Sequence, residues 1–272
     1  MEQYGLENIR NLVLLSHSGA GKTSLSEAML FNAKAISRLG KVDDGNTTSD
    51  YDPDEVKRHI SINLSLLPFE WKKTKINLID TPGYADFVGE VKAAIRVSEG
   101  AVIVVCAASG VEVGTEQVWA YSEEANLPRL IFVNKMDREN ADFYKAVEEI
   151  QSKLGSKCQP AQLPIGAQDN FQGVVDLLTM KGYAGSPPEE IEIPPSMREQ
   201  VDSFRGKLVE AIAAVDDKLI EKYLNDEELS TEELQHGLRE AVAAGKIVPI
   251  LTGSALQDIG VNLLLDAIYD YL

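Results

Sequence analysis

The chain has 272 residues, of which 44% are hydrophobic and 25% are charged, a composition typical of a protein that buries a sizeable core. No apolar run reaches the roughly 18 residues that a membrane-spanning helix needs, and the N-terminus lacks the layout of a signal peptide. We therefore expect a cytoplasmic protein without a membrane partner. The net charge of −17 opposes non-specific attraction to nucleic acid, and we expect no sequence-specific nucleic-acid binding either. An anionic ligand would need a local binding device.

Short β-branched runs alternate with helical patterns over the first half of the chain. The expected strands cover residues 11–15, 75–80, 101–108 and 129–134, and the expected helices cover residues 22–33, 87–97, 115–125 and 142–154. This alternation predicts βαβ crossovers and an α/β fold, with a mainly parallel sheet and helices on both faces. Chemistry should then lie at the carboxyl ends of the strands.

The character of the sequence changes near Cys158. The next part of the chain holds a proline-rich acidic link and two acidic helical patterns, at residues 186–197, 200–223 and 231–244. A strand pattern then returns at residues 247–251. We therefore expect an inserted α/β subdomain, residues 158–246, within a domain formed by residues 1–157 and 247–272.

A strand, a glycine-containing loop and a helix follow one another between residues 11 and 30. A phosphate loop requires glycine, four residues and then Gly-Lys-Ser/Thr, and this chain has Ser16 in place of the first glycine. Backbone N–H groups can still point at phosphates, while Lys22 reaches the outer phosphates and Thr23 ligates Mg²⁺. An ordinary glycine turn before a helix is the alternative. The predicted nucleotide-binding residues here are Ser18, Gly19, Ala20, Gly21, Lys22, Thr23 and Ser24.

A second candidate loop, Asp80 to Gly83, closes the expected strand at residues 75–80. An aspartate at this place can hold a water bound to Mg²⁺, and the N–H of Gly83 can meet a terminal phosphate because no side chain shields it. Asp-Thr-Pro-Gly is also a good turn sequence, so this motif is weak alone. Tyr84 would follow the glycine at the point where the terminal phosphate is attacked.

Two further loops suit recognition of a base. Asp137, in the stretch Asn-Lys-Met-Asp, can accept hydrogen bonds from the N1–H and 2-amino groups of guanine, whereas adenine offers no such pair of donors. Lys135 can lie along the base and Asn134 can brace the neighbouring loops; a solvated loop of charged residues is the alternative. After the last expected strand, the base pocket would be completed by Ser254, Ala255 and Leu256.

With these residues together, the chain resembles the nucleotide-binding part of elongation factor G, the ribosomal translocation GTPase. Matching stretches run from SHSGAGKTSLSEAMLF to GVNLLLDAIYDYL and include the insertion. The resemblance implies a P-loop GTPase fold, GTP or GDP and Mg²⁺ as ligands, and the ribosome as partner, with four further family domains outside this sequence. It also implies Mg²⁺ ligation by Thr23, Ser61 and Asp80, and catalytic roles for Lys22, Gly83 and Tyr84.

Four positions around the terminal phosphate depart from the family pattern. The family has aspartate at Gly19, an apolar residue at Ser18, threonine at Ser61 and histidine at Tyr84. The chain thus resembles a divergent elongation-factor-G-like paralogue. These departures bear on a monovalent-cation site and on the hydrolysis rate, but they do not affect the choice of nucleotide.

The expected function is that of a translation GTPase, slow unless the ribosome stimulates it. The alternative is a GTP-gated module that binds the ribosome with little or no hydrolysis, and an ATP-using enzyme is disfavoured by Asp137. The acidic helices of the insertion offer a docking face for a ribosomal stalk protein, as the resemblance implies, and we expect the isolated domain to be monomeric.

Overall fold

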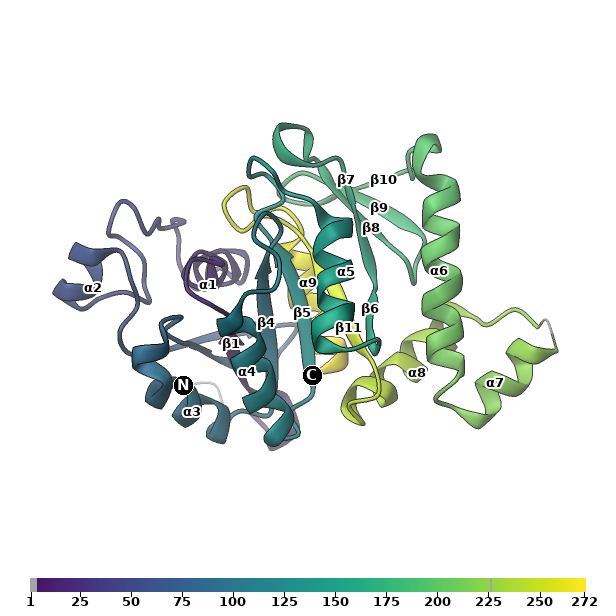
Figure 1. The fold of residues 1–272 in the computed structure, drawn as a ribbon, viewed down its shortest axis with the longest axis horizontal. Helices are drawn as coiled ribbons and strands as arrows, with labels where there is room; N and C mark the ends of the chain where they lie inside the picture. The colour runs from purple at the N-terminus through teal and green to yellow at the C-terminus, as the bar shows by residue number, and fades with distance from the viewer. Residues whose placement is uncertain (1–3, 226) are drawn as a thin grey trace.

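The computed structural model describes residues 4–225 and 227–272, and its centre is a seven-stranded sheet (Figure 1). Six of the seven strands are parallel, and five of these lie in the order β3-β1-β4-β5-β11. Their bounds are β1 (Ile9–Leu15), β3 (Thr74–Asp80), β4 (Gly100–Cys106), β5 (Arg129–Asn134) and β11 (Val248–Thr252). At the two edges, β2 (Ser65–Trp71) pairs antiparallel with β3, and β6 (Cys158–Pro160) pairs parallel with β11.

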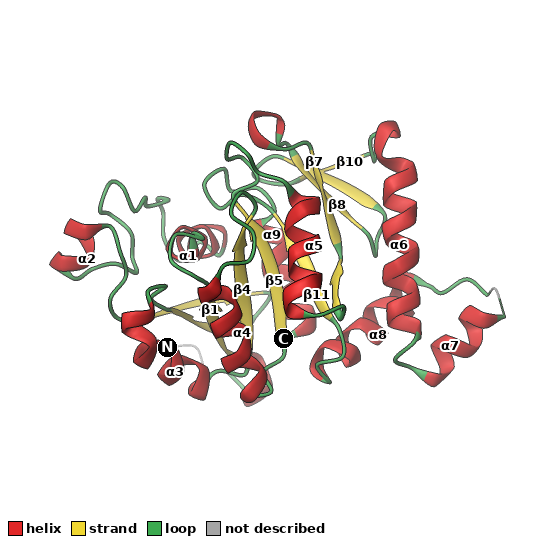
Figure 2. Ribbon diagram, viewed as in Figure 1, coloured by secondary structure: helices red, strands yellow, loops and turns green. Residues whose placement is uncertain are grey.

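Helices cover both faces of this sheet (Figure 2). On one face, α1 and α9 contact each other, and on the other face α3, α4 and α5 lie in a row (Figure 1). The central strands β4 and β5 are buried along their whole length, as parallel strands between two helical layers must be. The helix bounds are α1 (Lys22–Asn32), α3 (Val88–Val97), α4 (Val113–Glu124), α5 (Phe143–Leu154) and α9 (Val261–Tyr271).

A second, antiparallel sheet follows β6, in the order β10-β9-β8-β7. Its strands are β7 (Gln162–Ile165), β8 (Gly173–Asp176), β9 (Lys181–Ala184) and β10 (Glu189–Ile191). Three helices complete this region, α6 (Arg198–Ala213), α7 (Asp217–Leu224) and α8 (Thr231–Ala243). The predicted α/β class, with a mainly parallel sheet and an added α/β region, is confirmed, while the exact boundaries of the insertion stay a prediction.

The single helical stretch expected at residues 200–223 is two helices, so that expectation is wrong. Asp216 has an extended backbone, and its side chain accepts hydrogen bonds from the N–H groups of Lys218 and Leu219. An aspartate in this arrangement caps the start of a new helix. The periodicity of the side chains continues across the break, and therefore periodicity alone could not locate it.

Other elements were not expected from the sequence. β2 alternates buried and exposed residues as an edge strand should, but Pro68 in its middle masks the pattern. The short helix α2 (Pro53–Arg58) begins with a capping box formed by Asp52 and Glu55. Single 3₁₀ turns lie at Leu6–Asn8, Ala85–Phe87, Gln168–Asn170 and Pro195–Met197. Within residues 4–225 and 227–272, no helix is both long and apolar enough to cross a membrane.

Candidate functional site

The predicted loops meet around a cavity of about 500 Å³ at the carboxyl ends of the parallel strands. The cavity is lined by residues of all four loops: Ser18, Gly19, Gly21, Lys22, Thr23, Ser24, Gly83, Tyr84, Asn134, Lys135, Asp137, Ala255 and Leu256. The predicted Ala20 and Ser254 are fully buried behind these loops, and Asp80 is 1% exposed. A cavity of this size suits a nucleotide-sized ligand.

The phosphate loop is shaped by Gly21 and by the start of α1. Gly21 has a φ of 93°, and a Cβ there would lie 2.6 Å from Asn134 Nδ2, so a larger residue would be strained and would clash. The backbone then turns into α1 at Lys22, which leaves the first N–H groups of this helix without helical acceptors. These donors are suited to bind an anion.

Lys22 is buried at the base of this loop. Its ammonium donates to Ser16 Oγ at 2.8 Å and to the carbonyl of His17 at 3.4 Å. Burial lowers the pKa of Lys22 to about 8, although the neighbouring Asp80 and Asp50 favour the charged form. Ser16, which stands in place of the first motif glycine, thus holds the lysine side chain.

Oxygen ligands gather where a Mg²⁺ ion is expected. The Thr23 hydroxyl donates to Asp80 Oδ2 at 2.9 Å and lies 3.1 Å from Ser61 Oγ, which donates to Asp50 Oδ1 at 2.7 Å. Asp80 Oδ1 is buried and accepts no hydrogen bond from any described residue, and burial raises the pKa of Asp80. Two hydroxyls and two carboxylates form a set of hard oxygen donors, and the orphaned oxygen leaves one position free for a ligand. The residues therefore fit Mg²⁺.

The cluster formed by Thr23, Ser61, Asp80 and Asp50 holds one residue, Asp50, that sequence reasoning missed. Asp50 lies in an acidic stretch with Asp52 and Asp54, and nothing in the local sequence sets it apart. Only the folded chain brings it next to Ser61. Among the described residues, no group of three or more His, Cys, Asp or Glu side chains is arranged to hold a metal, so hydroxyl and phosphate oxygens would have to complete the coordination.

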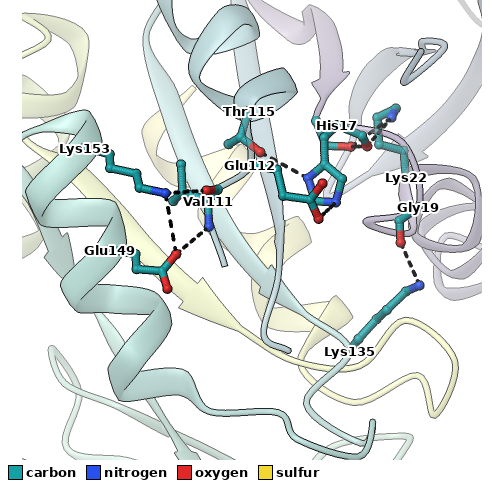
Figure 3. Close-up of polar contacts among 10 residues, drawn as sticks. His17, Gly19, Lys22, Val111, Glu112, Thr115, Lys135, Glu149 and Lys153 are labelled. Atoms are coloured by element: carbon teal, nitrogen blue, oxygen red, sulfur yellow. Dashed lines mark hydrogen bonds and ion pairs between the residues drawn. The ribbon is translucent and has the colours of Figure 1, made fainter. Parts of the chain in front are cut away.

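His17 ties the phosphate loop to the start of α4 (Figure 3). Its Nδ1 lies 3.1 Å from Thr115 Oγ1 and its Nε2 lies 2.9 Å from Glu112 Oε1. Burial lowers the pKa of His17; Glu112 opposes this shift, whereas Lys22 adds to it. A neutral ring with its proton on Nε2 satisfies both partners. A Cβ on Gly114 would lie 2.9 Å from His17 Cβ, so α4 packs directly on the loop.

The expected base loop is joined to the phosphate loop. Asn134 Nδ2 donates to the carbonyl of Ala20 at 3.0 Å, and Asn134 Oδ1 accepts from the N–H of Ala255 at 3.0 Å. Lys135 Nζ donates to the carbonyl of Gly19 at 2.8 Å (Figure 3). Asp137 Oδ1 is buried and has no hydrogen-bond partner among the described residues. These hydrogen bonds hold the phosphate loop, the Asn134–Asp137 loop and the loop at Ala255 together. The buried Asp137 Oδ1 beside them lacks a hydrogen-bond donor among the described residues, which a bound ligand could supply.

Gly83 and Tyr84 lie at the phosphate end of the cavity. A Cβ on Gly83 would be 2.7 Å from Ser18 Cα and 2.8 Å from Lys22 Nζ, so only glycine permits this close approach to the phosphate loop. Tyr84 lines the cavity with a side chain that is 43% exposed.

Comparison with known proteins gives one consistent result. The family model described as the elongation factor Tu GTP binding domain matches residues 7–272. Elongation factor G from Thermotoga maritima and from Thermotoga petrophila are each 43% identical over 272 residues, which is 98% of this chain and 39% of each relative. A crystal structure of a protein from Thermus thermophilus superimposes with a TM-score of 0.92 at 37% identity, covering 97% of this chain and 40% of that one. The chain thus spans about two fifths of the length of these relatives. It belongs to the family of elongation factor Tu GTP-binding domains and is a translational GTPase G domain of the elongation factor G type.

Proposed function

We propose that this chain binds GTP and GDP with Mg²⁺ and hydrolyses GTP as the nucleotide-binding part of a factor that acts on the ribosome. The observation that carries the proposal is Asp137 Oδ1, a buried carboxylate oxygen without a donor among the described residues, beside a cavity of nucleotide size. Guanine supplies two neighbouring donors, its N1–H and its 2-amino group, for the two oxygens of this carboxylate, whereas adenine offers no such pair. The choice of base follows from this carboxylate.

The remaining residues divide the work at the phosphate end. Lys22 and the N–H groups at the start of α1 would bind the phosphates, and an anion beside Lys22 would keep this lysine charged. Thr23, Ser61 and Asp80, together with Asp50, would hold Mg²⁺, which neutralises charge that develops on the phosphates.

Hydrolysis would depend on Gly83 and Tyr84. The Gly83 N–H would contact the terminal phosphate, and the Tyr84 hydroxyl would orient the attacking water. A phenol is a weak base at neutral pH and carries no positive charge, so Tyr84 can contribute positioning only. We infer a slow GTPase that accelerates when the ribosome turns the ring into the site.

A second candidate function is a GTP-gated module that binds the ribosome and hydrolyses little or no GTP. The exposure of Tyr84 favours it, because a residue that is 43% exposed is not held by packing in one orientation towards a terminal phosphate. In both cases the ribosome is the proposed partner, with the acidic region after β6 as the docking face for its stalk protein.

The test combines binding and turnover. Competition against a fluorescent GDP derivative should show GDP binding at least about 100-fold more tightly than ADP. Single-turnover GTP hydrolysis is then measured with and without ribosomes, both for this chain and for the full-length protein encoded by its gene. Stimulation supports the GTPase, GTP-dependent ribosome binding without turnover supports the module, and equal affinity for GDP and ADP would overturn both.

A further inference from the structure

The loop that follows β11 is closed on itself and carries one residue of unusual conformation. Ser254 and Ile259 exchange two backbone hydrogen bonds, of 2.9 and 3.0 Å, so the four residues between them form a tight loop. Asp258 in this loop has a φ of 57° and is 7% exposed. Aspartate tolerates this left-handed conformation better than most residues do, but a carboxylate is buried only when it has partners.

Asp258 finds its partners in two distant parts of the chain. Its Oδ1 accepts from Asn32 Nδ2 at 2.5 Å, at the end of α1, and its Oδ2 accepts from Ser186 Oγ at 2.6 Å, in the turn between β9 and β10. Asn32 Oδ1 in turn accepts from Asn262 Nδ2 at 2.7 Å, in the first turn of α9. One carboxylate thus joins the loop to the helix that begins at the phosphate loop and to the antiparallel sheet.

The same loop faces the cavity on its other side. Ala255 and Leu256 line the cavity, and the N–H of Ala255 is bonded to Asn134. Leu256 is 61% exposed, whereas Ala255 and Ile259 at the two ends of the loop are buried. Between these buried ends, side-chain polar contacts reach the loop at two points, Asn134 at Ala255 and the partners of Asp258.

We propose that Asp258 is a positioning residue that seats the base-recognition loop and, through Ser186, couples the added antiparallel sheet to the retention of guanine nucleotide. This inference rests on the proposed function of the cavity. Movement of the turn between β9 and β10 would loosen the loop and speed nucleotide release. A partner that binds the antiparallel sheet thereby gains a route to the nucleotide site, through residues that contact neither the base nor the phosphates.

The experiment measures the release rate of a fluorescent GDP derivative from a set of variants. Asp258→Gly removes both hydrogen bonds while glycine keeps the left-handed backbone, and release should be at least about tenfold faster. Asp258→Asn should stay within about twofold of the wild type, because the amide can accept from Asn32 and donate to Ser186. Such rescue by the conservative variant would not follow if any change at this site damaged the fold.

Two variants leave Asp258 unchanged, and they test its positioning role even if Asp258→Gly does not fold. Ser186→Ala removes only the contact from the antiparallel sheet and should speed release about threefold. Asn32→Asp sets a second carboxylate against Asp258 and should speed release at least about tenfold. Ser156→Ala, at an exposed serine outside this network, is the control and should match the wild type.

The outcomes separate this inference from the proposed function. A wild type that does not retain GDP in preference to ADP would overturn the proposed function. A wild type that retains GDP, with Asp258→Gly and Asn32→Asp releasing it at the wild-type rate, would overturn the positioning role of Asp258. An unchanged rate in Ser186→Ala would overturn the coupling to the antiparallel sheet.

Discussion

Replacing Asp137 by asparagine should exchange the base preference of the cavity from guanine to xanthine. The wild-type Oδ1 is buried without a partner among the described residues, so two guanine N–H groups would satisfy a desolvated carboxylate. In Asp137→Asn, the amide NH₂ faces one of the two guanine donors. One charge-assisted hydrogen bond is lost, and that guanine N–H is left without an acceptor. The loss is about 3 to 4 kcal/mol, or roughly 100- to 1,000-fold in the dissociation constant for GDP.

Xanthine should recover most of this loss, because its 2-oxo group accepts a hydrogen bond from the amide. The assay is competition of GDP, XDP and ADP against a fluorescent GDP derivative, and against the matching XDP derivative for the variant. Asp202→Asn, at an exposed aspartate of α6, is the matched control and should bind as the wild type does. A GDP-to-XDP ratio that is the same in Asp137→Asn and in the wild type would refute the assignment of this loop.

Three further predictions concern the phosphate end. Tyr84→Phe should lower ribosome-stimulated turnover at least about tenfold, or about 1.4 kcal/mol of barrier, and turnover equal to the wild type would exclude a role for the hydroxyl. Burial raises the pKa of Asp50 to about 6 from an ordinary 3.8. Between these two pH values, Asp50 keeps its proton in the nucleotide-free folded protein but has lost it in the unfolded chain. The free energy of unfolding of the protein should therefore fall as pH rises from about 4 to 6, and Asp50→Asn should remove part of this fall in urea titrations with EDTA; identical slopes would contradict it. Protease cleavage of residues 34–60 and of the chain after Gly83 should be slower with Mg²⁺ and a GTP analogue than with GDP, because the terminal phosphate would add a contact to Gly83 and, through Mg²⁺, to Ser61; equal cleavage would count against a mobile loop.

The sequence alone determined the alternation of strands and helices and the place of the main motifs. Lys22 and Thr23 stand at a helix start, and Asp80 and Asn134 stand at strand ends. These positions follow from local patterns, since parallel strands joined by helical crossovers bring their carboxyl ends to one edge. The meeting of the motif residues at that edge could therefore be expected from the order of the elements alone.

The tertiary structure decided which of many similar polar residues take part. Asp50 and Asp258 lie in stretches with no local signal, and each gains its role from residues in other elements. Asp50 contacts Ser61 and lies near Asp80, and Asp258 contacts Asn32 and Ser186. A carboxylate becomes buried and bonded only when distant segments close around it, and its local sequence is the same whether or not they do. Local spacing thus determines the motifs, whereas the contacts that brace them depend on the packing of the whole chain.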